Sequence, residues 1–308
     1  MSETSEAASD NGHPRPNGVL LLDKPSGLTS NAALQKVRRL FWRVKAGHTG
    51  TLDPLASGLL PICLGEATKF SHPLLEARKA YLATLRLGWH SSTGDSEGEL
   101  SAVAAPDFDE QALNRAIDAL TGAVEQVPPM YSAIKVKGRP LYSLARKGIN
   151  VERDARRVHI YQLDVLRRSG ETLEIFALCS KGTYIRVLAE DLGEQLGCGA
   201  YLAGLRRVSI GALQISDAVG FEWLEFASMS ERLALLQPLD LLLEDVRPLR
   251  LNEHNSRQLC HGLAIPGYAD IAPLERARIY TKDGRFLGLG EVDEAGLLKP
   301  KRLISKAF

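Results

Sequence analysis

The sequence predicts an α+β protein with a small second module at its C-terminus. Segments with strand periodicity and segments with helical periodicity alternate irregularly, without the strand–helix–strand rhythm of a doubly wound sheet. Near Pro248 the pattern changes to short strands separated by turns such as KDGR and VDEAG. The length of 308 residues accommodates one large and one small domain, each with its own core.

The elements of the large domain follow from local pattern. Residues 18–27 (GVLLLDKPSG) predict a buried strand ending in a Pro-Gly turn, and residues 29–44 predict a helix with Ser30 as N-cap. Apolar side chains alternate from Tyr81 to Trp89, so they share one face of a strand. The same rules predict a helix at 107–122, two strands in 157–180, a helix at 182–197, a strand at 205–216 and a short helix after Asn252.

Composition excludes several classes of protein. Hydrophobic content of 44% and charged content of 24% are typical of globular proteins, and no apolar run approaches the roughly 20 residues of a membrane span. The polar segment 1–16 predicts a disordered tail and not a signal peptide, so we expect a cytoplasmic protein. The spacing of the cysteines and histidines matches no metal motif, and we expect reduced cysteines and no metal: Cys63, Cys179, Cys198, Cys260.

Charge is concentrated although the net charge is only +1. Residues 31–50 hold five basic residues and no acids, and residues 133–159 hold eight basic residues and two acids. Two such segments, the second flanked by tyrosines, favour a polyanionic partner such as RNA or DNA. Residues 127–154 also have weak periodicity and strong charge, so we interpret them as an exposed insertion.

Asp53 stands out in the segment GHTGTLDPLASG (47–58), because it directly precedes an apolar run. Pro54 is compatible with the first position of a helix, so Asp53 could be a helix N-cap. The glycines around it suggest instead that the backbone approaches a ligand closely, and then Asp53 would be a reactive carboxylate held by a distant Arg or Lys. A phosphate-binding loop is excluded because the segment lacks the G-K-[ST] ending. The two catalytic carboxylates of a glycosidase are excluded because the segment holds no second acid.

Segment 47–70 (GHTGTLDPLASGLLPICLGEATKF) resembles the catalytic motif of the TruB family of bacterial tRNA pseudouridine synthases. Residues 21–30, 79–99, 127–148 and 179–207 resemble further motifs of that family, and the segment from Arg247 resembles a PUA domain. The resemblance implies a pseudouridine synthase fold, with a central mixed, mostly antiparallel sheet flanked by helices. It also implies isomerisation of the T-loop uridine (U55) of tRNA, through base flipping and rejoining of the uracil through C5.

The resemblance assigns roles to individual residues. Asp53 matches the catalytic aspartate, Tyr81 the tyrosine that stacks on the base and is proposed to move the C5 proton, and Arg186 the arginine that pairs with the aspartate and keeps its pKa low. Four residues match positions that hold the substrate: His48, Tyr184, Leu205 and Asp95. Lys135 and Arg146 are our candidates for contacts to RNA phosphates, and Lys24 is expected to brace the active-site loop.

We therefore expect a disordered tail at 1–16, a catalytic domain at 17–246 with an RNA-binding insertion at about 127–157, and a PUA domain at 247–308. The reaction involves no redox change, so no cofactor is expected. The expected partner is the T-stem-loop of tRNA, without a membrane or an obligate protein partner, and the protein is expected to be a monomer. Two alternatives remain: a non-catalytic RNA-binding or remodelling protein, and an RNA-guided pseudouridylase in a complex, against which the acidic tail argues.

Overall fold

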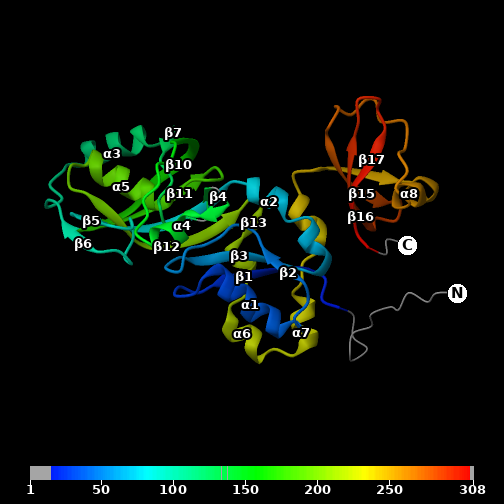
Figure 1. The fold of residues 1–308 in the computed structure, drawn as a ribbon, viewed down its shortest axis with the longest axis horizontal. Coiled ribbons are helices and arrows are strands. Elements are labelled where there is room, and N and C mark those ends of the chain that lie inside the picture. Colours follow the sequence, from blue (N-terminus) through cyan, green and yellow to red (C-terminus); the bar gives the residue numbers. More distant parts are fainter. Residues whose placement is uncertain (1–14, 133, 137, 306–308) are drawn as a thin grey trace.

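The centre of the molecule is a nine-stranded mixed sheet, which confirms the predicted α+β class (Figure 1). The structure is a computed structural model and describes residues 15–132, 134–136 and 138–305; most of the predicted tail, residues 1–14, lies outside this range. Strand order is β1-β3-β12-β4-β11-β10-β7, with β2 beside β3 and β13 beside β12. The strands are β1 Gly18–Lys24, β2 Ala46–His48, β3 Ser57–Leu64, β4 Lys79–Leu87, β7 Gly122–Gln126, β10 Arg156–Ser169, β11 Thr172–Cys179, β12 Ala200–Ile210 and β13 Leu213–Gln214.

One junction in this sheet is parallel. β12 runs parallel to β3 over the pairs Arg206–Ser57 and Arg207–Gly58, and the other strand pairs of the sheet are antiparallel. On its other side β12 pairs with β4, where Arg207 lies directly opposite Tyr81. The loop that precedes β3 is therefore held beside the middle strands of the sheet.

Helices cover one face of the sheet and bury the predicted apolar stripes. α1 (Ser30–Leu40), α3 (Glu110–Ala119), α5 (Ile185–Gln195) and α6 (Phe221–Phe226) pack with β1, β3 and β4 in one core. The opposite face is covered by shorter elements: η1 Gly65–Lys69, α2 His72–Glu76, η2 Ile215–Asp217, η3 Leu239–Leu243. The predicted N-cap of α1 is wrong by one residue, because Thr29 accepts the Ala32 N–H while the Ser30 hydroxyl bonds elsewhere.

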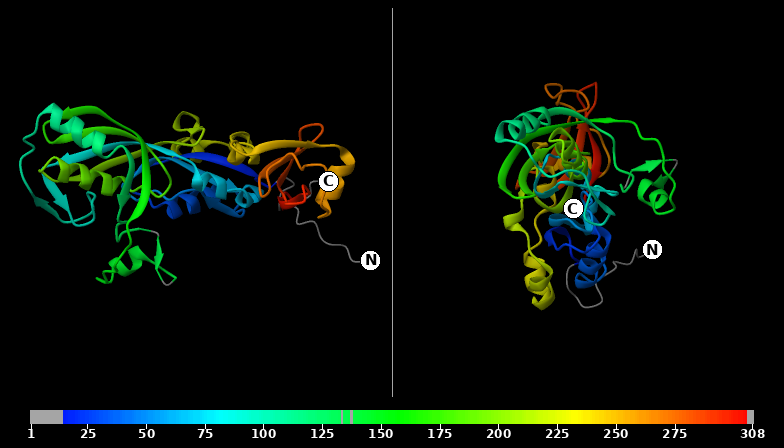
Figure 2. Two further views of the ribbon diagram at one scale, coloured as in Figure 1. Left: turned by 90° about the horizontal axis from the view of Figure 1, so that it is seen from above. Right: turned by 90° about the vertical axis from the view of Figure 1, so that its left-hand side faces the viewer.

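The predicted insertion projects from the body of the domain. It contains β8 (Lys135–Val136), β9 (Arg139–Pro140) and α4 (Leu141–Ala145), which form a small hairpin and one helical turn. Figure 2 shows this unit standing away from the main sheet, below it in the left-hand view. A second hairpin, β5 (Trp89–Ser91) with β6 (Leu100–Ala102), follows β4.

A separate four-stranded sheet begins at Arg247, with its own hydrophobic core. Its elements are β14 Arg247–Leu251, α8 Glu253–Cys260, β15 Arg276–Thr281, β16 Phe286–Val292 and β17 Leu298–Leu303. Asn252 caps α8, as predicted. The Lys69 ammonium donates to the Leu303 carbonyl at 3.1 Å, and the Phe70 and Phe286 rings pack edge to face at 5.3 Å, so the sheet docks on η1. That this module is a PUA domain stays a prediction.

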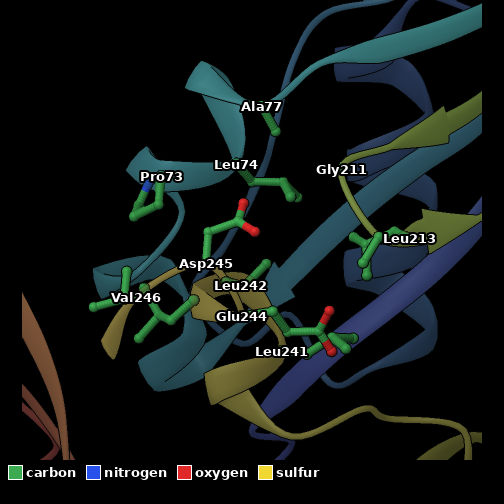
Figure 3. A pocket seen from close by; sticks show the side chains of 12 residues that line it. Pro73, Leu74, Ala77, Gly211, Leu213, Leu241, Leu242, Glu244, Asp245 and Val246 are labelled. Carbon is green, nitrogen blue, oxygen red and sulfur yellow. The ribbon is translucent and has the colours of Figure 1, made fainter. Parts of the chain in front are cut away.

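A small cavity lies between α2 and η3 (Figure 3). Its volume is about 30 Å³, the space of about one water molecule. Leucine side chains dominate its walls, and Glu244 and Asp245 lie at η3. This cavity is too small for a nucleotide.

Among the residues that the structure describes, none of the helices combines the length and the apolar character that a membrane-spanning helix requires.

Candidate active site

Asp53 lies in the loop between β2 and β3, and the chain after Pro54 enters a strand. The helix-cap interpretation of Asp53 is therefore wrong. Hydrogen bonds from α1 and the turn before it hold this loop. The Ser30 hydroxyl accepts the Leu52 N–H at 2.8 Å and donates to the Leu52 carbonyl at 2.9 Å. The Gly27 N–H donates to the Pro54 carbonyl at 2.8 Å. These bonds fix the backbone on both sides of the carboxylate.

Lys24 braces this arrangement, as we expected. Its buried ammonium donates to the carbonyls of Pro25 at 2.8 Å and Leu28 at 2.7 Å, which closes the turn that contacts the Asp53 loop. Burial lowers the pKa of Lys24 to about 8, although the negative charge of Asp53 opposes the shift. The lysine therefore supports the loop and also contributes charge near the carboxylate.

Arg186 connects Asp53 to a second carboxylate. Its Nη2 lies 3.0 Å from Asp53 Oδ2, and its Nη1 lies 3.4 Å from Asp95 Oδ2. The same guanidinium donates to the carbonyls of Tyr131 at 2.7 Å and Thr93 at 3.3 Å. Arg186 is the second residue of α5, and it is only 4% exposed. This side chain is therefore fixed in position by four partners.

Burial raises the pKa of Asp53 above its ordinary value, which is the opposite of the predicted direction. Arg186 lowers the pKa of this carboxyl as expected, but desolvation is the larger effect, and the charge of Asp95 adds to it. The Asp53 side chain still keeps 37% of its surface exposed, against 4% for Arg186. Asp53 is thus the member of the pair that a substrate can reach.

Tyr81 lines the same cavity as Asp53 and contacts a second arginine. Arg207, its cross-strand partner, is 1% exposed, and donates from Nε to the Leu59 carbonyl at 2.8 Å and from Nη2 to the Gly50 carbonyl at 3.0 Å. Burial raises the pKa of Tyr81, while the positive charge of Arg207 lowers it. Arg207 therefore connects β12, β3 and the loop before Asp53 to the tyrosine.

Two glycines of the motif lie against Arg207. Gly58 has a φ of +102°, and a Cβ there would lie 2.3 Å from the Arg207 carbonyl oxygen. At Gly58 the close approach is therefore to the backbone of Arg207 and not to a ligand. Gly50 has a φ of +74°, and its Cβ would lie 3.3 Å from Arg207 Nη1. Gly50 also lines the cavity described next, so the approach of a ligand to its backbone stays a prediction.

The side chains described above line one cavity with a volume of about 250 Å³. This volume is close to the lower limit of pockets for small ligands, which is about 300 Å³. The structure brings five of the predicted site residues to it, which are Asp53, Tyr81, Arg186, Tyr184 and Leu205. Tyr184 enters from the turn before α5, where its N–H donates to Gln126 Oε1 at 3.0 Å. Other lining residues include Lys79, Ser132, Ser180 and Arg207.

Two predicted substrate residues do not line this cavity. Asp95 is 3% exposed, accepts a hydrogen bond from the Thr93 hydroxyl at 2.6 Å and lies behind Arg186. His48 lies on β2; its Nδ1 is buried and has no hydrogen-bond partner in the described part of the chain. Burial, and then Arg207, lower the pKa of His48, which favours a neutral imidazole. Contacts of these two residues with RNA stay predictions.

The two predicted phosphate ligands lie on the insertion. Arg146 is exposed and follows α4, with its guanidinium 5.7 Å from the Tyr142 ring centre. Lys135 belongs to β8, but its side chain lies outside what the structure describes. Sequence reasoning missed Lys79 and Arg207, both buried at the cavity. A signal existed for Lys79, because it occupies an inward position of a strand whose alternating residues are otherwise apolar or aromatic. The signal for Arg207 is weaker, because its alternating neighbours are Leu205 and Ser209.

Comparisons with known proteins agree along the whole chain. The N-terminal domain of TruB family pseudouridylate synthase matches residues 38–185, the tRNA pseudouridylate synthase B C-terminal domain matches 186–244, and a model described as pseudouridine synthase II TruB, C-terminal, matches 248–304. The tRNA pseudouridine synthase B of Aromatoleum aromaticum is 52% identical over 94% of this chain and 93% of its own length. That of Dechloromonas aromatica is 48% identical over 94% and 96%.

Solved structures show the same fold. A Cbf5-Nop10-Gar1 complex contains a chain with a TM-score of 0.71 and 25% identity, covering 96% of this chain and 85% of that one. An H/ACA RNP bound to a substrate RNA containing 2'-deoxyuridine contains a chain with a TM-score of 0.72, at 22% identity and over 100% of this chain and 92% of that one. The fold and the matches together define the class of the protein, which is a pseudouridine synthase, an isomerase. Within that class the chain belongs to the TruB family.

Proposed function

We propose that this enzyme converts the T-loop uridine of tRNA, U55, to pseudouridine. Relatives that are about half identical to this chain over 94% of its length are named tRNA pseudouridine synthase B, which supports tRNA as the substrate. In the reaction the N1–C1′ bond breaks, a C5–C1′ bond forms, C5 loses a proton and N1 gains one. Atoms and electrons balance without an oxidant or a second substrate.

The observation that carries the proposal is the placement of Asp53 and Tyr81 in one cavity with Arg186. The Arg186 guanidinium, fixed by two backbone carbonyls, orients an Asp53 carboxylate that remains accessible. Asp53 assists departure of the uracil, by attack on C1′ or by removal of a sugar proton, and must be ionised to do so. Tyr81 packs against the base and accepts the C5 proton, with its hydroxyl placed by Arg207.

A uridine inside a folded T-loop can reach this cavity only after it has flipped out of the loop. Flipping costs a few kcal/mol, which contacts with the rest of the RNA offset. The insertion, with Arg146 and Lys135, and the exposed basic residues Arg39 and Arg43 at the end of α1 supply positive charge for such contacts. We assign residues 17–246 to catalysis and 247–308 to a PUA domain that adds RNA affinity, in a cytoplasmic monomer.

The test is a single-turnover reaction on a T-stem-loop transcript, with the modified base mapped. We expect pseudouridine at the position of U55 with the wild-type chain alone, and no product with Asp53→Asn at unchanged RNA affinity. Turnover by Asp53→Asn would contradict the role of Asp53. Product at another position would contradict the choice of U55.

The same assay separates the two alternatives. A protein that only binds or remodels RNA would give no product with any transcript. An RNA-guided enzyme in a complex would give product only when a guide RNA and partner proteins are added. Chains in a Cbf5-Nop10-Gar1 complex and in an H/ACA RNP bound to a substrate RNA share this fold. We favour action on free tRNA, because the relatives with high sequence identity are tRNA enzymes by name.

A further inference from the structure

A stack of three side chains lies beside the cavity and has no part in the chemistry above. Arg78 lies between α2 and β4, and its guanidinium carbon is 3.9 Å from the centre of the Tyr161 ring. The His159 ring lies 4.5 Å from the same tyrosine, at an interplanar angle of 45°. Arg78 is exposed, and Tyr161 is 38% exposed. The stack is therefore on the surface and accessible to a large ligand.

Tyr161 lies on the exposed face of β10, next to an irregularity in the sheet. Exposed and buried side chains alternate from Val158 to Tyr161, so Tyr161 shares its face with His159. Ile160 pairs with Cys179 and Gln162 pairs with Leu178, so Tyr161 is the extra residue of a β-bulge in β10. Bulges are frequent next to active sites.

The backbone on both sides of the stack is tied to the cavity. Arg78 directly precedes Lys79, which lines the cavity, and its carbonyl accepts the Gly211 N–H at 2.9 Å. His159 exchanges two hydrogen bonds with Ser180, another lining residue, at 2.8 and 2.9 Å. Hence a ligand held by Arg78 would lie at the rim of the cavity.

The chemistry of the stack favours an anion. In the described part of the chain, Arg78 forms no ion pair with a carboxylate, and the nearby Glu76 pairs with Lys181. When a guanidinium stacks on an aromatic ring, its N–H groups point outward in the plane of the guanidinium. In that plane they can donate to the oxygens of a phosphate. Arg78 and His159 both pack against the Tyr161 ring, so the ring is in a position to orient the guanidinium.

We propose that the Arg78–Tyr161–His159 stack is a phosphate-binding site for the RNA, which holds the backbone next to the nucleotide that enters the cavity. Arg78 donates to the phosphate, and Tyr161 and His159 are positioning residues that keep the guanidinium in place. This inference rests on the proposed function, because it assumes an RNA substrate in the cavity.

The chain provides a matched control for the test. Arg168, also exposed, stacks on Phe108 at the same distance, 3.9 Å, but it lies near the far end of β10, opposite Leu173. Arg168→Gln removes the same charge and the same kind of cation–ring contact as Arg78→Gln, and in addition the hydrogen bonds that Arg168 donates to the carbonyls of Phe108 at 3.2 Å and Pro106 at 3.5 Å. We expect Arg78→Gln to raise the Kd for the T-stem-loop about ten-fold and to reduce the salt dependence by about one phosphate contact, while Arg168→Gln changes neither.

Replacing single RNA phosphates by uncharged methylphosphonates identifies the contact. We expect one position next to the target uridine at which a methylphosphonate makes the Kd values of wild type and Arg78→Gln equal. Tyr161→Leu should reproduce part of the loss of RNA affinity that Arg78→Gln causes. Equal Kd values and equal salt dependence for Arg78→Gln and Arg168→Gln would overturn the proposal. It would also be overturned if no methylphosphonate position made the Kd values of wild type and Arg78→Gln equal. Pseudouridine formation by wild type is measured in the same samples, so failure of the proposed function is recognised separately.

Discussion

The two sides of the active-site cavity are both organised around a buried arginine, but with opposite charge. On the acidic side, Arg186 lies between the carboxylates of Asp53 and Asp95. On the cationic side, Arg207 lies beside Tyr81 and Lys79 and donates to backbone carbonyls; in the described part of the chain it pairs with no carboxylate. One side has an excess of negative charge and the other has an excess of positive charge.

This difference matches the places where charge develops in the proposed reaction. In that proposal the sugar loses its bond to N1 and becomes electron-poor, and the Asp53 carboxylate would stabilise it. The departing uracil would become electron-rich, and a dry cationic side would stabilise it without reorganisation. We therefore propose different tasks for the two arginines: Arg186 orients a carboxylate, whereas Arg207 and Lys79 provide positive charge for the base and for Tyr81.

The largest effect should come from the acidic side. Arg186→Gln leaves two facing carboxylates without their shared cation, and it removes the bonds to Thr93 and Tyr131. We expect the single-turnover rate to fall by about 10³-fold or more. The acid limb of the pH–rate profile should also move to higher pH, because Arg186 lowers the pKa of Asp53. A rate within a few-fold of wild type would show that Asp53 acts without Arg186.

On the cationic side, Arg207→Gln should slow turnover by roughly 10- to 100-fold. Glutamine cannot donate to both Leu59 and Gly50, and removal of the charge raises the pKa of Tyr81 further. In a Tyr81→Phe background the same change should cost much less, because Arg207 acts through the hydroxyl. If Arg207→Gln slowed turnover by the same factor in the Tyr81→Phe background, Arg207 would act independently of Tyr81. Thermal melts of each variant serve as the control for unfolding.

Asp95→Asn separates the two carboxylates of the acidic side. Asparagine retains an oxygen that can accept the Glu97 N–H, which Asp95 accepts at 3.1 Å, but the negative charge disappears. Since the charge of Asp95 raises the pKa of Asp53, the acid limb should move to lower pH. The plateau rate should fall by roughly ten-fold, because Arg186 is held less firmly. An unchanged acid limb would exclude coupling between the carboxylates.

Lys79→Met should change stability and its dependence on pH. Burial, and then Arg207, lower the pKa of Lys79 to about 8, so between pH 8 and 10.5 the folded protein binds fewer protons than the unfolded chain. The free energy of unfolding of wild type should therefore rise with pH in this window relative to Lys79→Met, by about 2–3 kcal/mol. Denaturant titrations at pH 7.5 and 10 measure the difference. Parallel pH dependence of the two proteins would refute the low pKa.

Most elements were predictable because their signals are local. Strand alternation around Tyr81, the apolar stripe of α1 and the cap at Asn252 all follow from periods and caps within a few residues. The α+β class and the separate C-terminal sheet were recognisable for the same reason. Where local rules allowed two outcomes, they failed: Pro54 permitted a helix after Asp53, but pairing of β3 with β1 and β12 made the segment a strand.

By itself, the sequence determined the elements, the family resemblance and the residue types of the site. Its motifs nominated Asp53, Tyr81 and Arg186, which the structure brings to one cavity. Only the tertiary structure decided the environment of these groups. The pKa of Asp53 rises because burial outweighs Arg186, and desolvation depends on atoms contributed by distant segments. The contact between Arg207 and Tyr81 and the contact between Arg78 and Tyr161 likewise form only in the folded protein, because strand pairing and packing bring side chains from distant segments together.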